Sequence, residues 1–280
     1  MPNPLRLAAP LAAALLVVAT AACTDASADT ATGGGVTGGD LASFTGLAFR
    51  EEGSFGLDRA ELREDGTVLR VRFPAGSASN RAGGPEGGAQ AYLPLPEPVD
   101  ELVLRYRVRF PDGFDFVKGG KLPGLYGGTV TSGQRIPDGT DGFSTRYMWR
   151  AEGAGEVYAY LPTSVDAGTS LGRGCWTFPT GRWTEVEQHV RLDVPGASDG
   201  TVTVRVDGTP VLHRTGLTFR TTTDLRIEGV FLSSFFGGGD SSWATPVDQY
   251  LDLADVEVGP PTAAPAGPED PACAGEEDAS

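Results

Sequence analysis

The sequence has little lysine, histidine or cysteine, and it lacks an excess of basic charge. Its 280 residues include two lysines, two histidines and three cysteines, and acidic residues outnumber basic ones by 37 to 22. Domains that bind nucleic acids electrostatically are normally basic, so no nucleic-acid partner is predicted. The two histidines, His189 and His213, are isolated and form no metal-ligand motif. We therefore predict no metal and no other cofactor.

The sequence also lacks a hydrophobic run long enough for a stable membrane span, since the apolar run of Leu7 to Ala19 is too short. It follows a single cation, Arg6, and is typical of a signal peptide occupying residues 1–22. The small residues Thr-Ala-Ala then precede Cys23, a pattern similar to a bacterial lipobox. This pattern predicts an exported lipoprotein, anchored to the outer face of the cell membrane by lipidation of Cys23. Simple secretion is the alternative.

Composition divides the remaining chain into three parts. Residues 23–40 have almost nothing to bury and predict a flexible tether, whereas residues 259–280 predict a disordered acidic tail. The domain itself is expected over 41–258. Because export implies an oxidising environment, a disulfide between Cys175 and Cys273 is predicted to join the tail to the domain. A metal site is disfavoured, since these cysteines have no histidine-rich neighbourhood.

Turn formers and alternating strands dominate the domain. Its 40 glycines and 21 prolines, counted over the whole chain, argue against a helical bundle. Apolar side chains alternate with polar ones from Leu102 to Phe110, which predicts a strand with one buried face. A hairpin is expected to turn at Asp207-Gly208. The predicted fold class is all-β, a two-sheet antiparallel jelly-roll sandwich. Further strands are expected at 68–73, 183–194, 225–236 and 249–258.

Both lysines of the chain lie in one short stretch, at Lys118 and Lys121. In a chain that otherwise uses arginine, a lysine is informative because its pKa shifts on burial, whereas arginine keeps its proton. The intervening Gly119-Gly120 pair lets the backbone approach a ligand or adopt positive φ. This stretch is therefore a candidate for amine chemistry, with an ordinary turn as the alternative.

Two strands joined by a tight turn are predicted at 142–150 and 156–161. In an antiparallel hairpin, the numbers of opposite residues have a constant sum. A turn centred on Gly153 predicts that Arg146 lies opposite Tyr160.

The same turn predicts Met148 opposite Tyr158. Because side chains two residues apart share a face, Ser144 lies beside Arg146, and Tyr158 beside Tyr160. One face of the hairpin would then present a hydroxyl, a guanidinium and two phenols. An ordinary solvated strand face is the alternative, since tyrosine is common in strands.

Two other patterns suggest different chemistry. Glu185 and Glu187 share a strand face, and glycoside hydrolases use paired carboxylates. An ordinary polar strand face is the favoured interpretation. The stripe of Arg105, Arg107 and Arg109 predicts a solvated sheet face, with steering of an anionic ligand as the alternative.

Four motifs, in this order, together resemble polysaccharide lyase family 14. They are Lys118-Gly-Gly-Lys121-Leu-Pro-Gly, Gly142-Phe-Ser-Thr-Arg-Tyr-Met-Trp-Arg150, Val157-Tyr-Ala-Tyr160 and Gly229-Val-Phe-Leu-Ser-Ser-Phe-Phe-Gly-Gly-Gly-Asp-Ser-Ser-Trp243. The resemblance extends over about residues 99–258. It implies a β-jelly roll and β-elimination of uronic-acid polymers such as alginate or glucuronan.

The resemblance also assigns residues to the reaction. It implies Lys121 as base or activator, Arg146 as the group that neutralises the uronate carboxylate, and Ser144 as an orienting residue. Either Tyr158 or Tyr160 carries the proton. These are the predicted catalytic groups, with Ser144 among the substrate-binding ones.

Lys118 begins the first of these motifs and Arg150 ends the second, and both are predicted to bind substrate. The expected partner is therefore an anionic polysaccharide, and the protein is expected to be a monomer. Two alternatives stay open at this point. They are a non-catalytic, lectin-like carbohydrate-binding sandwich and a glycoside hydrolase that uses Glu185 and Glu187.

Overall fold

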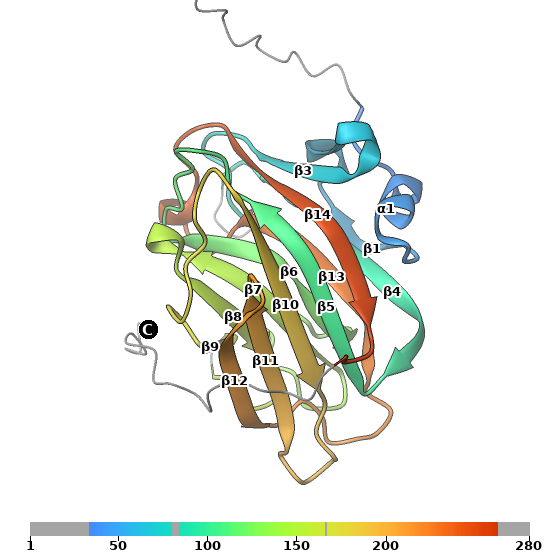
Figure 1. Ribbon diagram of the computed structural model, residues 1–280. Helices are drawn as coiled ribbons and strands as arrows, with labels where there is room; N and C mark the ends of the chain where they lie inside the picture. The colour runs from blue at the N-terminus through green and yellow to red at the C-terminus, as the bar shows by residue number, and fades with distance from the viewer. Residues whose placement is uncertain (1–33, 80–83, 166, 263–280) are drawn as a thin grey trace, which may run out of the picture. The chain divides into compact units, whose positions relative to one another are not determined.

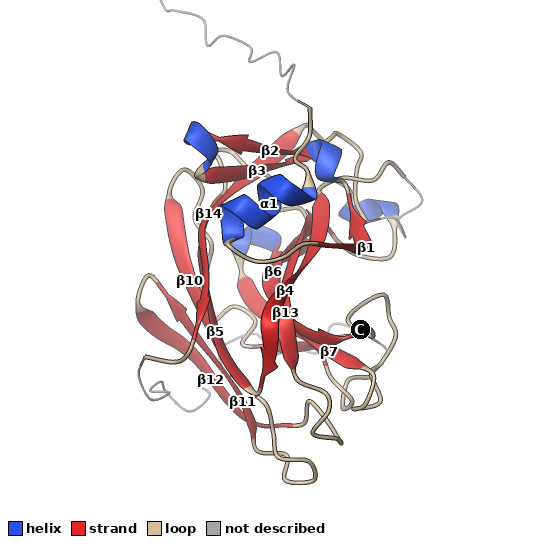
Figure 2. Ribbon diagram, turned by 90° about the vertical axis from the view of Figure 1, so that its right-hand side faces the viewer, coloured by secondary structure: helices blue, strands red, loops and turns tan. Residues whose placement is uncertain are grey.

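Two antiparallel β-sheets pack face to face in the computed structural model (Figure 1), which describes residues 34–79, 84–165 and 167–262. The two layers are seen edge-on in Figure 2. Sheet A contains, in spatial order, β1 (Arg50–Phe55), β4 (Ala89–Val99), β13 (Ile227–Phe236), β6 (Gly119–Gly128), β7 (Gly142–Arg150), β8 (Gly155–Tyr160) and β9 (Thr169–Leu171). Sheet B contains β12 (Thr209–Leu217), β11 (Gly200–Val206), β10 (Trp183–Arg191), β5 (Glu101–Arg109), β14 (Gln249–Gly259), β3 (Val68–Phe73) and β2 (Ala60–Arg63). The predicted all-β sandwich is confirmed.

Helix is scarce in the described residues. The α-helix α1 (Gly38–Thr45) begins with a capping box in which Thr37 and Asp40 exchange hydrogen bonds. The tether predicted over 23–40 is therefore wrong at its end, since Val36 is buried and α1 starts at Gly38. Short 3-10 helices lie at η1 (Leu57–Arg59), η2 (Glu64–Gly66), η3 (Ala151–Gly153) and η4 (Ser241–Trp243). No helix in this part of the chain is long and apolar enough to cross a membrane.

The core lies between the two sheets and follows the alternation of the strands. In β5 the buried residues Leu104, Tyr106 and Val108 alternate with half-buried arginines. Each fully buried apolar side chain contributes about 1.5–3 kcal/mol. Where the sheets meet near β3, rings pack edge to face, with the centroids of Phe73 and Phe236 5.3 Å apart.

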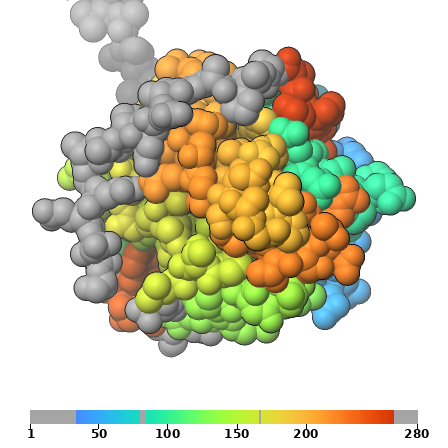
Figure 3. Space-filling model, turned by 90° about the horizontal axis from the view of Figure 1, so that it is seen from below, coloured from blue at the N-terminus to red at the C-terminus, as the bar shows by residue number. Residues whose placement is uncertain are grey.

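The hairpin predicted to turn at Asp207-Gly208 is confirmed. Asp207 and Gly208 both have positive φ, as a two-residue hairpin loop between β11 and β12 requires. The loop before β7 and the loop after β12 are joined by a hydrogen bond, in which the amide of Thr221 donates to the carbonyl of Gly139 at 2.8 Å. Figure 3 views the molecule from below and shows green and yellow segments from the middle of the chain beside orange segments from its later part.

Several predictions fall on residues outside the described ranges. These include the signal peptide over 1–22, the lipidation site at Cys23 and most of the acidic tail over 259–280. Cys175 is disulfide-bonded, but Cys273 also lies outside the described residues. The predicted pairing of Cys175 with Cys273 therefore stays a prediction.

Candidate active site

Strands β7 and β8 carry the predicted hydroxyl, guanidinium and phenols on the face of sheet A that points away from sheet B. The predicted register is wrong by two residues, because Arg146 lies opposite Tyr158, and Ser144 opposite Tyr160. The reason is the turn, which forms the 3-10 helix η3 centred on Glu152, a residue with φ of 59°. Since the shift is an even number of residues, the side chains keep their predicted face.

A β-bulge brings Lys121 onto the same face. Lys121 pairs with Met148, but Gly124 pairs with Arg146, so β6 contains one extra residue between these positions. Pro123 occupies the bulge, where its missing N–H does not interrupt a regular ladder. Leu122 is buried in the core. Without the bulge, Lys121 and Gly124 would lie on opposite faces of the strand.

The glycine pair before Lys121 serves packing rather than ligand approach. A Cβ at Gly120 would come 2.1 Å from the ring of Trp149, and one at Gly119 would come 2.5 Å from the Trp149 carbonyl oxygen. Gly119 also has a φ of 137°, which favours glycine. The pair therefore lets β6 lie close against β7.

Lys121 is a buried amine in a cationic environment. Its Nζ donates to Sδ of Met148 at 2.5 Å and lies 3.7 Å from the ring centroid of Tyr158. Burial lowers the pKa of Lys121 well below its ordinary value, and the nearby charges of Arg146 and Arg150 lower it further. A lysine with a lowered pKa is neutral in a larger fraction of molecules and can then accept a proton.

Arg146 is a buried cation whose carboxylate partner is missing. Its side chain is among the largest fully buried ones, and Nη1 donates to Oγ of Ser233 at 3.1 Å. The guanidinium carbon lies 4.6 Å from the ring centroid of Phe231, while Nε is buried without a hydrogen-bond partner. Within the described residues, no ion pair involves Arg146. Because burying an unpaired charge is costly, this arrangement suits an anionic ligand.

The two tyrosines lie beside these cations. Tyr158 and Tyr160 contact each other edge to face, with ring centroids 5.7 Å apart. The hydroxyl oxygen of Tyr158 accepts from the amide of Gly168 at 3.0 Å, and that of Tyr160 accepts from the amide of Gln134 at 3.4 Å. Burial raises the pKa of Tyr158. Tyr158 therefore keeps its proton near neutrality and is available as an acid.

Ser144 is engaged with the backbone of a neighbouring loop. Its hydroxyl donates to the carbonyl of Thr131 at 2.7 Å, and the Thr131 hydroxyl shares a 2.7 Å hydrogen bond with the hydroxyl of Tyr92. Ser144 thus fixes the loop that follows β6. That loop also supplies Gln134, whose amide binds Tyr160.

The two other predicted substrate-binding residues differ in their surroundings. Arg150 donates through Nε and Nη2 to one oxygen of Glu156, at 2.9 and 2.6 Å, so its charge is partly neutralised by a carboxylate that it shares with Arg173. Lys118 lies on the surface, where Nζ donates to the hydroxyl of Ser242 at 2.5 Å and lies 6.0 Å from the ring centroid of Trp243.

Sequence reasoning gave no role to three side chains of this face. Met148 and Ser233 bind the lysine and the arginine, and Glu156 binds Arg150. The rule that side chains two residues apart share a strand face could have placed Glu156 here, because it lies two residues before Tyr158. The positions of Met148 and Ser233 depend on pairings between strands that are distant in the sequence.

Glu185 and Glu187 lie on sheet B instead. Arg105 binds Glu187 at 2.5 Å and lies 4.0 Å from Glu185. Arg205 also approaches Glu187, at 3.6 Å. This ion-pair network is the polar strand face that was the favoured interpretation, and it leaves no free carboxylate pair for hydrolysis.

A family comparison identifies this sandwich as a polysaccharide lyase. Residues 61–256 match the family described as polysaccharide lyase 14. The chain belongs to that family, as the four sequence motifs predicted.

Solved structures show the same jelly-roll fold. The marine PL-14 alginate lyase from Aplysia kurodai is 29% identical, with a TM-score of 0.68 over 81% of this chain and 97% of that one. Alginate lyase Aly36B is 24% identical, with a TM-score of 0.67 over 81% and 92%. Alginate lyase vAL-1 from a Chlorella virus is 21% identical, with a TM-score of 0.63 over 72% and 89%. No curated protein matches the chain.

Proposed function

We propose that this lyase cleaves 4-linked uronic-acid polymers, alginate or glucuronan, by β-elimination. The observation that carries the proposal is the buried Arg146, which has no acidic partner in the described residues and shares a sheet face with the Lys121 amine. A uronate carboxylate is the anion that such a site would neutralise. The alginate lyase of Aplysia kurodai, at 29% identity, supports alginate as one candidate. Aly36B has been solved with an alginate tetrasaccharide.

Arg146 acts first in this scheme, by binding the carboxylate of the uronate. Removal of the C5 proton builds negative charge next to that carboxylate, and a preorganised guanidinium stabilises it. The neutral amine of Lys121 takes the C5 proton. The electron pair left on C5 forms the C4=C5 double bond as the C4–O bond breaks.

A tyrosine completes the proton balance by donating its phenolic proton to the leaving oxygen. Both tyrosines are candidates for this role, because Tyr158 lies beside Lys121 and Tyr160 beside Arg146. Single substitutions to phenylalanine separate the two. The acid is the tyrosine whose loss lowers turnover by roughly 10²-fold or more, whereas loss of the other mainly raises KM.

The direct test is incubation with alginate, glucuronan and a neutral glucan, followed by ultraviolet absorbance. Elimination leaves a C4=C5 bond conjugated with the carboxylate, which absorbs, whereas hydrolysis produces new reducing ends without that chromophore. We expect absorbance to rise with at least one uronate polymer and not with the glucan. Reducing ends without absorbance would contradict the proposal, as would binding without turnover.

We further propose that the enzyme is exported and lipid-anchored through Cys23, or secreted. The support is the sequence Thr-Ala-Ala-Cys after an apolar run. Expression in a bacterial host followed by detergent partitioning tests the anchor. Cys23→Ser should move the protein from the detergent phase to the aqueous phase.

A further inference from the structure

Beside Lys121 lies a carboxylate that the proposed reaction does not use. Glu156 is fully buried and is bound by two arginines from different segments. Arg150 on β7 donates to its Oε1, and Arg173, which follows β9, donates to its Oε2 at 2.6 Å. Glu156 also pairs in register with Met148, the residue whose sulfur accepts from Lys121.

The bridge pairs one carboxylate with two guanidinium groups and therefore keeps a net positive charge. Burial alone would raise the pKa of Glu156, but the two guanidinium groups outweigh that effect and keep its pKa below the ordinary value. Glu156 is therefore ionised and neutralises part of the charge of Arg150 and Arg173. Arg146, by contrast, forms no ion pair within the part of the chain that the structure describes.

The pKa of Lys121 depends on charged side chains from several segments. Arg146 and Arg150 from β7, together with Arg173, disfavour its protonated form, whereas Glu156 from β8 favours it. The neighbour on β13 is the uncharged Phe235. Among these charged groups, Glu156 is the one that counters the cations around the amine.

We propose that Glu156 is a positioning residue that sets the basicity of Lys121 and holds Arg150 and Arg173 away from the substrate carboxylate. The proposal rests on the proposed function, in which Lys121 removes the C5 proton. A base weakens as its pKa falls. By opposing three cations, Glu156 keeps the amine basic enough to take the proton while leaving Arg146 to receive the carboxylate.

The chain offers a direct measurement, because Lys118 and Lys121 are its only lysines. With isotope-labelled lysine, the full chain gives two side-chain signals in a nuclear magnetic resonance titration, and Lys118→Arg identifies the signal of Lys121. We expect Glu156→Gln to lower the pKa of Lys121 by about one unit, the scale for a neighbouring charge. Arg173→Gln removes a cation and should raise that pKa by a similar amount.

Asp252 supplies the matched control. It is also a fully buried carboxylate between two arginines, Arg70 at 2.8 Å and Arg109 at 2.8 Å, but it lies on sheet B. Asp252→Asn should destabilise the protein without moving the pKa of Lys121. If Glu156→Gln and Asp252→Asn both leave the Lys121 titration unchanged, the role of Glu156 is structural only and the proposal is overturned.

Activity provides the second readout. In Glu156→Gln, the acidic limb of kcat/KM should move to lower pH together with the pKa of Lys121, and the plateau should fall because the base is weaker. If the pKa of Lys121 changes but the acidic limb of kcat/KM stays at the same pH, the catalytic part of the proposal is overturned. If Glu156→Gln does not fold, Arg173→Gln takes its place as the test variant. It must then move both the Lys121 titration and the acidic limb of kcat/KM to higher pH. Absence of elimination by the wild-type chain would instead overturn the proposed function, because the titration needs no substrate.

Discussion

The outward faces of the two sheets use the same strand pattern for different purposes. Both display arginines, at alternate positions on β5 in sheet B and four residues apart on β7 in sheet A. In sheet B each of these arginines has an acidic partner across the strand. The pairs are Arg105 with Glu187, Arg107 with Asp255, and Arg109 with Asp252. In sheet A, Arg150 has such a partner and Arg146 does not.

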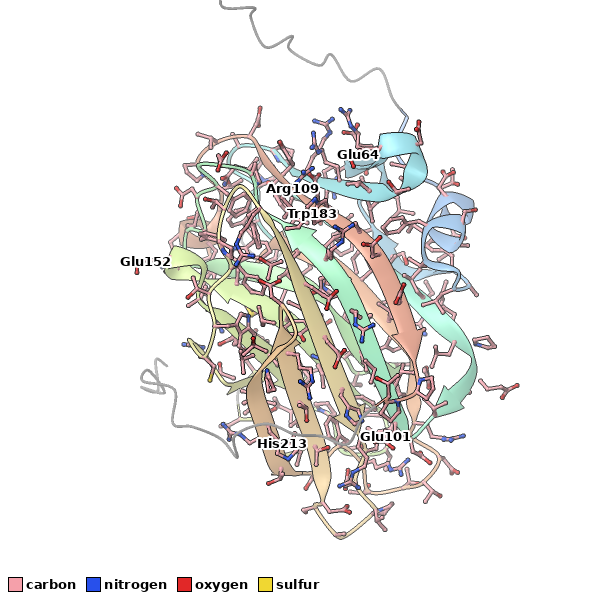
Figure 4. The ribbon with its side chains drawn as sticks, in the orientation of Figure 1. Glu64, Glu101, Arg109, Glu152, Trp183 and His213 are labelled. Atoms are coloured by element: carbon pink, nitrogen blue, oxygen red, sulfur yellow. The ribbon has the colours of Figure 1, made fainter. Side chains whose placement is uncertain are left out.

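The neighbouring strands decide this difference. Strands β10 and β14 flank β5 and bring glutamate and aspartate into register with its arginines. Figure 4 shows Arg109 beside Trp183 and Glu64 at one end of this face; Arg109 lies 4.6 Å from the Trp183 ring centroid and 3.6 Å from Glu64. Because its charges are paired, the stripe is poorly suited to steer an anionic polymer. The unpaired Arg146 of sheet A is better suited to bind one.

The strongest test of this contrast is Lys121→Arg. The positive charge is kept, but the guanidinium is too basic to exchange a proton near neutrality. We expect turnover on the best uronate polymer to fall by roughly 10²-fold or more, the scale for a general base. Lys118→Arg, at an exposed position just before the same strand, should have a much smaller effect in the same steady-state assay.

The pH profile sharpens the same prediction. Only the neutral amine accepts a proton, so wild-type kcat/KM should rise as the pH rises through the lowered pKa of Lys121. That limb should disappear in Lys121→Arg. Near-normal turnover in the variant would show that Lys121 is not the base and would leave the tyrosines as the proton carriers.

Arg146→Gln should have the next largest effect. Loss of the carboxylate-neutralising group is expected to lower kcat/KM by roughly 10²–10³-fold, comparable to removal of an oxyanion donor. Arg107→Gln on sheet B is the matched control, because it removes the same charge from a paired position. Equal losses in the two variants, each with an unchanged melting temperature, would refute the contrast between the faces.

Asp252→Asn should affect stability rather than turnover. Its carboxylate is buried, but its arginine partners are 17% and 30% exposed. We expect a loss of about 2–3 kcal/mol in urea unfolding, somewhat less than for a fully buried pair. Activity at a temperature where the variant remains folded should be close to that of the wild type.

Glu187→Gln should have the smallest effect. Its partners Arg105 and Arg205 are 38% and 26% exposed, so solvent screens the pairs and the expected loss is about 1 kcal/mol or less. Urea unfolding measures this loss. Abolished elimination in a folded Glu187→Gln variant would instead support the alternative in which Glu185 and Glu187 are catalytic.

Local patterns predicted much of this protein. The alternation in β5, the Asp207-Gly208 turn and the shared face of Ser144 and Arg146 all follow from rules that act within a few residues. The hairpin register was missed by two residues because a 3-10 turn replaced a simple loop. The predicted face was still correct, because side chains two residues apart in a strand point to the same face.

Periodicity and short motifs are properties of neighbouring residues, so they were enough to predict the sandwich, the family and the residue types of the site. Which charges are compensated depends instead on contacts made in the folded protein. The bulge at Pro123 turned Lys121 toward Arg146, and the pairing of β8 with β7 placed Glu156 under Arg150. Whether a buried charge is neutralised depends on strands brought together from distant parts of the chain. That neighbourhood, rather than the residue type, separates the candidate catalytic arginine from the structural ones.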